Sequence, residues 1–375
     1  MRGMKKISCV ILAVMAVFSC IKPFNPPAIS AANLNLLVVD GFIVPGSAST
    51  IKLSRTLNIT DSFQVVPELN AQLYLEGSSG SIIPFQAGVD NSYTCPTGFL
   101  SPDDQYRLRI ILQNGSEYLS DFVEVKQSPP IDTLEWDDKD GDVTIYISTH
   151  DPTARAKYYK WEYDETIEYR AAYEALVDWV DNQFVFLEPD ELRYQCYKFY
   201  NSTNIVIGNS SALSDDVIRR LRVTVIPGFD EKLSYRYSIL VKQYSLTADA
   251  YKYWQILQAN TEQNGNLFDP QPAQLRSNIH NTGNPGEPVV GYLSISSFTE
   301  KRIFIRNSQL RHPSTPPFFS DCKETFIDPS LAAQYLNGTE MKPAYFSRSQ
   351  GLAIAPAFCV DCRLRGGTTQ KPPYW

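Results

Sequence analysis

The clearest alternation of hydrophobic and polar positions lies between residues 233 and 242. Every second side chain is apolar, while serine, arginine and lysine occupy the positions between them. This period of two predicts a strand with one buried face, because successive side chains point to opposite faces of a sheet. The apolar face consists of Leu233, Tyr235, Tyr237, Ile239 and Val241.

The pattern then changes to a helical period. Thr247 can cap a helix, and Gly265 can end it in the left-handed conformation that favours glycine. We therefore expect one helix over residues 247–264, docked on a β domain. Its apolar positions recur at i, i+4 and i+7, namely Ala250, Trp254 and Leu257.

Upstream, short apolar segments recur at regular spacing, which is typical of an all-β domain. Asn114-Gly115 between the last two segments favours a two-residue hairpin. Residues 34–128 are therefore predicted to form a β-sandwich of immunoglobulin, fibronectin or transthyretin-like character, and Pro129-Pro130 marks its end. The expected strands are 36–44, 51–57, 71–75, 106–112 and 118–125.

A second β-sandwich domain is predicted over residues 131–306, and it carries the helix. Ser214 is expected to cap a short helical turn, and the last two strands are expected to pair as a hairpin. The remaining segment, 307–375, is rich in Pro, Ser and Gly and is predicted to be irregular. The expected strands are 143–147, 159–163, 203–207, 221–226, 289–296 and 301–305.

The segment 166–194 has no clean period, so we expect a long excursion from the second domain. Its aromatic side chains are the candidate partner-binding residues, because aromatics often carry interface energy. The alternative is that they fill the protein's own core. The candidates are Tyr169, Tyr173, Trp179, Phe184 and Phe186.

The N-terminus has the organisation of a bacterial lipoprotein signal. Basic residues precede the apolar run 7–18, and Val17-Phe18-Ser19-Cys20 resembles a lipobox. We expect removal of residues 1–19, lipidation of Cys20, and a tether over 20–33. An ordinary secretory signal or a short anchor helix is the alternative, although the run is too short to span a bilayer comfortably. Acyl chains on Cys20 would anchor the protein stably.

Composition excludes one class of partner. Without the first 19 residues the chain has 31 basic and 41 acidic side chains, a net charge of −10. Such an acidic chain is a poor candidate for binding nucleic acid or anionic lipid headgroups, because both carry negative charge.

The cysteines predict disulfides rather than thiol chemistry, as is usual for an exported protein. Cys359 and Cys362 form a CxxC pair, but the glycines and prolines that follow cannot form the helix that a redox motif needs. Cys95 is expected to stay unpaired, since it lies alone in the first domain. Three connectivities are open to the other four, and we favour Cys322 bonded to one member of the CxxC pair. The expected disulfide cysteines are Cys196, Cys322, Cys359 and Cys362.

No catalytic, metal or cofactor site is predicted. The acidic run 137–142 resembles a calcium loop, but its glycine occupies a ligand position, so a hairpin turn at Asp140-Gly141 is favoured. The three histidines lack partners at i+3 or i+4, and zinc bound by four cysteines would need reduced thiols. Neither a GxSxG elbow nor a phosphate-binding loop occurs in the sequence.

Several short motifs occur along the chain: Val39-Asp40-Gly41, residues 52–56, 128–132, 159–163, 235–238, Tyr253-Trp254, 268–272 and 362–375. Together they resemble the motifs of a family of Bacteroidota lipoproteins known as domain of unknown function 4249. The likeness extends almost to the C-terminus, although Ser277 stands where a glycine is expected.

The resemblance implies an outer-membrane lipoprotein, often encoded beside a TonB-dependent receptor, with no family catalytic residues. It favours a non-enzymatic accessory or ligand-capturing subunit of a TonB-dependent transporter, anchored in the outer membrane on its periplasmic or its surface side. The alternative is a free-standing carbohydrate- or peptide-binding lipoprotein. A hydrolase or thiol oxidoreductase is a third class, for which the sequence lacks the required groups.

Overall fold

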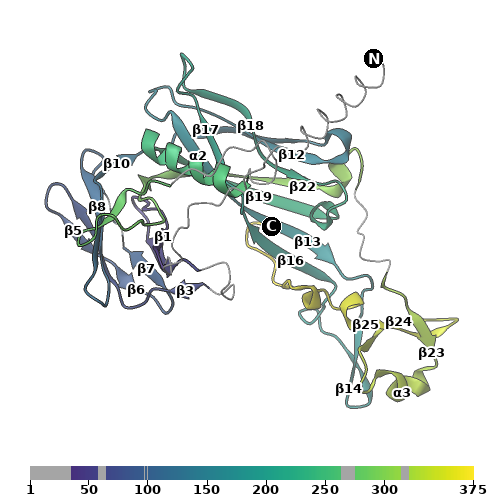
Figure 1. Cartoon of the computed structure of the whole chain (residues 1–375). Helices are drawn as coiled ribbons and strands as arrows, with labels where there is room; N and C mark the ends of the chain where they lie inside the picture. The colour runs from purple at the N-terminus through teal and green to yellow at the C-terminus, as the bar shows by residue number, and fades with distance from the viewer. Residues whose placement is uncertain (1–34, 58–64, 97, 99, 263–274, 314–320) are drawn as a thin grey trace, which may run out of the picture.

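The chain forms three lobes. We call them the N-terminal domain (residues 35–126 with 279–296), the central domain (131–170, 195–246 and 298–309) and the distal lobe (177–186 and 325–359). Figure 1 shows the N-terminal domain and the distal lobe at opposite ends of the molecule, with the central domain between them. The mainly β fold with two sandwich domains confirms the predicted class. The computed structural model describes residues 35–57, 65–96, 98, 100–262, 275–313 and 321–375.

The N-terminal domain packs two sheets around a core of aliphatic and tyrosine side chains. The strands form because apolar and polar residues alternate, so that one face of each sheet is buried. One sheet contains β1 (Leu37–Asp40), β2 (Ser49–Arg55), β7 (Ser92–Cys95) and β6 (Gln86–Ala87), with β3 (Val66–Pro67) paired to β2. The other contains β4 (Gln72–Gly77), β5 (Ile82–Pro84), β8 (Gln105–Ile111), β9 (Glu117–Ser120) and β10 (Val123–Lys126).

Two strands from much later in the chain complete this domain. β20 (Ile279–Asn281) pairs with β9, and β21 (Ile295–Ser296) pairs in parallel with β10. The predicted hairpin of 289–296 and 301–305 is therefore wrong, and the predicted domain 34–128 lacked these strands. A strand of two or three residues shows no period, so the sequence pattern could not assign it.

The central domain is a second sandwich. The strand β13 (Tyr158–Arg170) has the predicted aromatic face, which includes the fully buried Tyr159 and Trp161. One sheet contains β11 (Ile131–Asp137), β12 (Val143–His150) and β18 (Val217–Ile226). The other contains β16 (Gln195–Asn201), β17 (Val206–Asn209), β13 (Tyr158–Arg170), β19 (Arg236–Leu246) and β22 (Phe298–Arg306).

Two turns contain the predicted glycines. β8 and β9 form the predicted hairpin, but the Leu112 amide donates to the Ser116 carbonyl at 2.9 Å, so the predicted two-residue turn is wrong and the loop consists of residues 113–115. Only Gly115 has a positive φ, +84°, whereas the two-residue type I′ turn needs positive φ at both central residues. β11 and β12 are joined through the short η1 (Lys139–Gly141), where Gly141 has φ +94°. The acidic run 137–142 is therefore a strand connection, as predicted.

The helix α2 (Ala248–Glu262) lies against β13, β17 and β19. The Ala250 amide donates to Thr247 Oγ1 at 3.1 Å, which confirms the predicted cap. The predicted stop at Gly265 and the motif 268–272 lie outside the described residues.

The turn predicted at Ser214 is not helical. Instead, residues 210–216 form bends around the buried Asp216 carboxylate. Tyr159 donates its hydroxyl hydrogen bond to this carboxylate at 3.0 Å, and Ser210 also bonds to it. Satisfying a buried carboxylate outweighs the local preference for a helical turn.

The distal lobe contains two short sheets where the sequence pattern predicted irregular chain. β14 (Val177–Val180) pairs with β15 (Gln183–Phe186), while β25 (Gly351–Pro356) lies between β23 (Thr325–Ile327) and β24 (Met341–Ser347). Its helices are η5 (Pro329–Leu331), α3 (Ala332–Leu336) and η6 (Ala357–Cys359). The central domain has η2 (Glu231–Leu233) and η3 (Asn307–Gln309), and η7 (Cys362–Arg365) packs on its strand β16, with Cys362 in its core.

Candidate binding surfaces

The segment predicted to be an excursion splits between two structures. Residues 166–170 continue β13 within the central sheet, and β14 and β15 then form a hairpin. Asp181 and Asn182 form its two-residue turn with φ +51° and +62°. Asp and Asn tolerate this conformation, and two positive φ angles are typical of a type I′ hairpin. The Asp-Asn pair is the sequence signal that could have predicted this hairpin.

The five aromatic candidates have different environments. Tyr169 is fully buried and its hydroxyl donates to the Cys362 carbonyl at 2.7 Å, so its assignment to a binding surface is wrong. Tyr173 is half-buried and donates to the Cys322 carbonyl at 2.9 Å; burial and Glu324 raise the pKa of its hydroxyl to about 12. The hydroxyl groups of both tyrosines therefore bond to backbone carbonyls of the protein itself, and neither ring is an exposed binding surface.

The other three aromatics lie on the hairpin. Trp179 and Phe184 pack edge to face with ring centroids 4.7 Å apart, and Phe184 packs in the same way on Phe346 at 5.4 Å. The Trp179 indole also donates to Asn337 Oδ1 at 2.8 Å. Phe186 is 77% exposed and is therefore the only one of the five candidates that is free for a partner along most of its surface.

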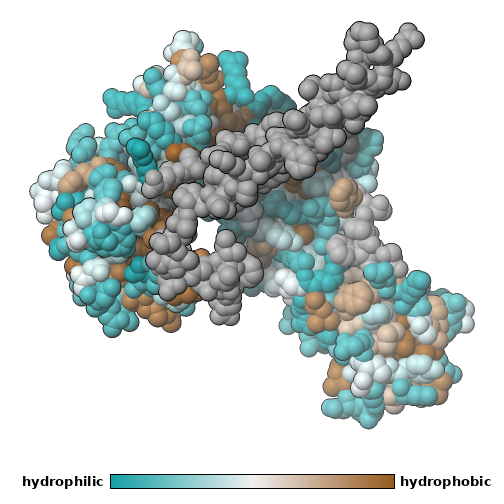
Figure 2. All heavy atoms as spheres, in the orientation of Figure 1, coloured by the Kyte–Doolittle hydropathy of each residue, from teal (hydrophilic) through white to brown (hydrophobic). Residues whose placement is uncertain are grey.

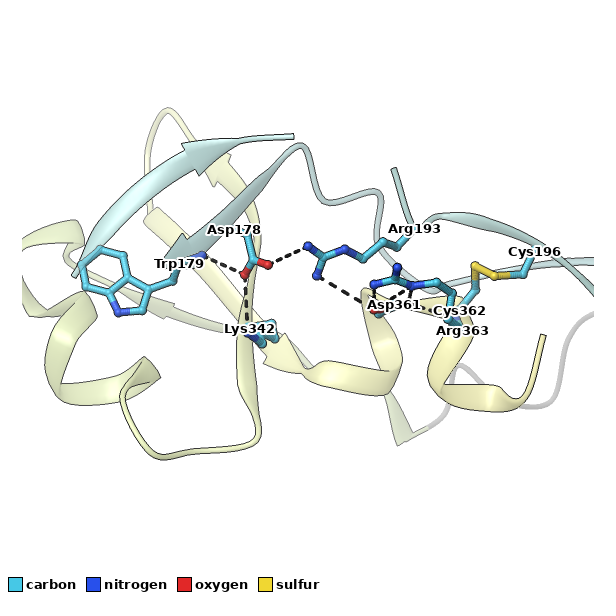
Figure 3. A network of polar contacts seen from close by, with 8 residues as sticks. All are labelled: Asp178, Trp179, Arg193, Cys196, Lys342, Asp361, Cys362 and Arg363. Carbon is cyan, nitrogen blue, oxygen red and sulfur yellow. Dashed lines mark hydrogen bonds and ion pairs between the residues drawn. A yellow bond between two sulfur atoms is a disulfide. The ribbon is translucent and has the colours of Figure 1, made fainter. Parts of the chain in front are cut away.

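A network of charges holds the hairpin to the rest of the lobe (Figure 3). Asp178 Oδ2 accepts from Arg193 at 2.7 Å, and Lys342 Nζ lies 3.5 Å from Oδ1. Arg193 also lies 3.9 Å from Asp361, which pairs with Arg363 at 2.8 Å. Burial alone would raise the pKa of Asp178 and Asp361, but their arginine partners outweigh it and hold both pKa values below the usual range.

Two disulfides fix the same region. Cys196 on β16 is bonded to Cys362, and Cys322 is bonded to Cys359, so the four expected cysteines are paired as we favoured. Each member of the CxxC pair is buried and has a distant partner, which indicates a structural role. Cys95 is the free cysteine of the described residues; it is buried, and burial raises its pKa to about 11.

The distal lobe exposes many large apolar side chains for its size. Figure 2 shows hydrophobic residues among hydrophilic ones on the surface of this lobe, at the lower right of the view. Contiguous exposed apolar surface is unusual on a soluble protein and often marks an interaction site. The exposed residues of the lobe and of the segments next to it are Leu176, Val180, Val185, Phe186, Leu331, Tyr335, Tyr345, Phe346, Phe358 and Leu364.

The sequence of the chain matches a known protein family. A family model described as "Domain of unknown function (DUF4249)" matches residues 21–302. The chain belongs to this family. The match confirms the family that the motifs predicted.

The matched residues of this DUF4249 protein include the hairpin of the distal lobe but not its second sheet or Cys322, Cys359 and Cys362. Among solved structures, the chain is similar to a two fibronectin type-III domain segment from chicken tenascin. The identity is 12%, with 55% of this chain and 88% of that chain covered, and the TM-score is 0.17. A comparison with curated proteins found no significant match.

The DUF4249 protein has a second candidate surface, a cleft of about 800 Å³ between the N-terminal and central domains. Glycine is required at two positions beside it. Gly41 and Gly291 have φ +143° and +138°, and a Cβ on either would collide with a backbone oxygen, of Thr50 or Val39. Gly41 of the Val39-Asp40-Gly41 motif is thus needed for local backbone packing.

The predicted lipidation site Cys20, the signal 1–19 and the tether 20–33 lie outside the described residues. Within the described ranges, no helix has the length and apolar character needed to cross a membrane. Nor do three or more His, Cys, Asp or Glu side chains come together there in a way that could hold a metal ion.

Proposed function

We propose that this DUF4249 protein is a non-enzymatic lipoprotein of the bacterial outer membrane. It serves as an accessory or ligand-capturing subunit of a TonB-dependent transporter and contacts that transporter through the distal lobe. The observation that carries the proposal is the set of exposed apolar side chains on a lobe held by two disulfides. The lipobox supports the assignment to the outer membrane, and the resemblance of the motifs to Bacteroidota lipoproteins supports a TonB-dependent transporter as the partner.

A rigid lobe suits this role, because a surface that is already ordered loses little entropy on binding. Phe186, Val185 and Leu176 lie in or next to the β14–β15 hairpin and present exposed apolar area at its surface. Phe186 is the aromatic residue among them, and aromatic side chains are the ones that most often dominate binding energy. Asp178 of β14 is already paired with Arg193 and Lys342.

Point substitutions test the proposal better than replacement of 169–186, which would remove the core residue Tyr169. The full-length lipidated protein is purified from outer membranes with its bound proteins, as wild type and as Phe186→Ser. We expect the variant to retain its thermal stability and to lose most of the co-purified TonB-dependent receptor. Val89→Ser in the N-terminal domain is the matched control, since Val89 is fully exposed. Equal recovery of the receptor from both variants would contradict the proposal.

The anchor is tested separately. Cys20→Ser should move the protein from the membrane fraction to a soluble fraction and abolish incorporation of labelled fatty acid, because Cys20 is the residue that follows the apolar run. A variant that stays in the membrane, together with a wild type that takes up no fatty acid, would exclude lipidation.

A second candidate function is a free-standing carbohydrate- or peptide-binding lipoprotein. The cleft between the two sandwich domains favours it, because ligand sites often lie at domain interfaces and have volumes of about 300–1,000 Å³. This function requires no transporter.

A further inference from the structure

The cleft between the sandwich domains is lined by both domains and by the chain segment that connects them late in the sequence. The N-terminal domain contributes residues from 38 to 54, and α2 and β19 contribute the facing wall. Buried hydrogen bonds join the domains next to it: Gln243 Nε2 donates to the Pro129 carbonyl at 2.9 Å, and Ser128 donates to the Gln243 carbonyl at 2.9 Å. The aromatic lining residues are Phe42, Tyr244, Tyr253, Trp254 and Tyr292.

Lys160 occupies the centre of this aromatic group. Its ammonium lies 3.7 Å from the centroid of a Trp254 ring and 4.8 Å from that of Phe42, and it donates to Glu162 Oε1 at 2.6 Å. The Lys160 side chain is only 7% exposed. Burial lowers its pKa, while Glu162 and Asp40 oppose that shift. Because the protein's own ammonium already fills the aromatic cage, a cationic ligand finds no vacant cage there.

The remaining charges of the lining are balanced. Asp40 and Lys52 are exposed cross-strand partners of β1 and β2, and the Glu162 side chain is 40% exposed beside Lys160. Two carboxylates and two ammonium groups therefore line the cleft together. They offer hydrogen-bond acceptors and donors without a net field that would favour an anion or a cation.

The strand edge beside the cleft is already occupied, so an extended peptide cannot pair with it. β1 lies at the edge of its sheet, where a peptide could add as a strand. Val290 already occupies that edge, because its carbonyl accepts from the Val39 amide at 2.8 Å and its amide donates to the Leu37 carbonyl at 2.9 Å. A peptide would lose the main-chain hydrogen bonds that usually carry such binding.

We propose that this cleft binds a neutral oligosaccharide. The C–H faces of the sugar rings pack on Tyr292 and on the ring surfaces of Phe42 and Trp254 that Lys160 does not cover. The hydroxyl groups, which both donate and accept, pair with Glu162, Asp40 and Lys52. The buried Trp254 Nε1 has no hydrogen-bond partner within the described residues. This indole N–H, on the helix that lines the cleft, is a hydrogen-bond donor without an acceptor in the described part of the chain. The inference deepens the second proposed function and rests on it, and it does not depend on the distal lobe.

Calorimetric titration of the full-length detergent-solubilised protein tests this inference. The probes are maltohexaose, cellohexaose, xylohexaose, mannohexaose and chitohexaose, with tri-galacturonic acid and a pool of hexapeptides as competitors of other classes. We expect at least one neutral hexasaccharide to bind with a Kd below about 1 mM. Absence of binding by all five neutral sugars at that concentration overturns the inference, as does tighter binding of the peptides or the acidic sugar.

Variants then locate the site. Trp254→Ala and Lys52→Ala should each weaken the sugar by about tenfold or more, corresponding to an interface residue that costs over 1 kcal/mol. Lys52→Ala is included because Lys52 is exposed, so this variant should fold even if Trp254→Ala does not. Phe186→Ser in the distal lobe should bind the sugar as wild type does. Wild-type affinity in Lys52→Ala together with wild-type affinity in any folded Trp254→Ala would overturn the assignment to the cleft, whatever the receptor pull-down shows.

Discussion

The N-terminal domain buries Leu, Ile and Tyr side chains in one large core between two sheets, whereas the distal lobe has two small clusters, one rich in alanine and one of Leu and Ile side chains. Ala175, Ala344, Ala353 and Ala355 belong to the alanine-rich cluster. Small side chains bury little apolar area, and each buried CH₂ contributes only about 0.8 kcal/mol. The distal lobe therefore depends on covalent and ionic links that the N-terminal domain does not need.

Two of those links are the disulfides, one within the lobe and one between β16 and η7. They close loops of 166 and 37 residues in sequence separation, and chain entropy gives about 5 and about 4 kcal/mol for loops of these lengths. Small domains with a limited core commonly rely on such links. In contrast, Cys95 in the N-terminal domain is a buried free thiol that acts as a small apolar side chain.

The largest effect should come from removal of the Cys196–Cys362 disulfide. Cys196→Ala with Cys362→Ala is expected to destabilise the attachment of the distal lobe by about 3–5 kcal/mol, while Cys95→Ala should cost about 1 kcal/mol in the N-terminal domain. Amide hydrogen exchange, followed separately in the distal lobe and in the N-terminal domain, measures the two losses of stability. Equal protection of the lobe in the double variant and the wild type would show that the lobe does not need this link.

A smaller effect is expected from Asp178→Asn. The variant keeps the shape of the side chain but loses the charge that pairs with Arg193 and Lys342, which should cost about 2 kcal/mol in the distal lobe. Chemical denaturation followed by Trp179 fluorescence would detect the change. Asp104→Asn is the control in the N-terminal domain, because Asp104 has no ion-pair partner among the residues that the structure describes and bonds to Ser78, Ser79 and neighbouring amides at the surface. A larger loss of unfolding free energy in Asp104→Asn than in Asp178→Asn would contradict the greater dependence of the distal lobe on ion pairs.

The pH dependence follows from the same carboxylates. Asp178 and Asp361 have folded pKa values below their unfolded value of about 4, so each contributes stability that is present above that value. This contribution is lost as the pH falls from about 4 through the lowered folded pKa. Hydrogen exchange at about pH 3 should therefore show weakened protection in the lobe of the wild type, with less further loss in Asp178→Asn. An identical acid response in the two proteins would exclude Asp178 as a cause.

The smallest effect on stability is expected at Phe186. Because its side chain is 77% exposed, Phe186→Ser should change the free energy of unfolding by less than about 0.5 kcal/mol. Trp179→Ser, which removes the contacts with Phe184 and Asn337, should cost several times more. Thermal unfolding of the two variants compares them directly. A large loss at Phe186 would mean that its ring packs within the protein.

The long strands can be predicted because their alternation of apolar and polar residues extends over enough residues to be recognised. The alternation at Tyr237, Ile239 and Val241 locates β19, and Tyr159 and Trp161 locate β13. Sequence pattern also located α2, through the Thr247 cap and the position of Ala250. In each case a local pattern and a buried face agree, which is the condition under which sequence predicts structure well.

The rest required contacts that are distant in sequence. β20 and β21 are too short to show a period, and they form because Ile279 and Ile295 fill the N-terminal core. The distal lobe was missed for the opposite reason: one of its two clusters is alanine-rich and its strand β24 contains Pro343, so neither hydrophobicity nor strand preference stands out. Tyr169 was misassigned because β13 continues further than its clear alternation does.

The central claim is that the distal lobe, and not the N-terminal domain, meets the transporter. A photo-crosslinking amino acid at position 186 and one at position 89 test it most directly, in cells that express the full-length lipidated protein at its normal level. Both positions are exposed, so the label can be placed at each without disturbing a core. We predict a crosslink from position 186 to a TonB-dependent receptor and none from position 89. A receptor crosslink from position 89 alone, or none from position 186 while the receptor still co-purifies, would contradict it.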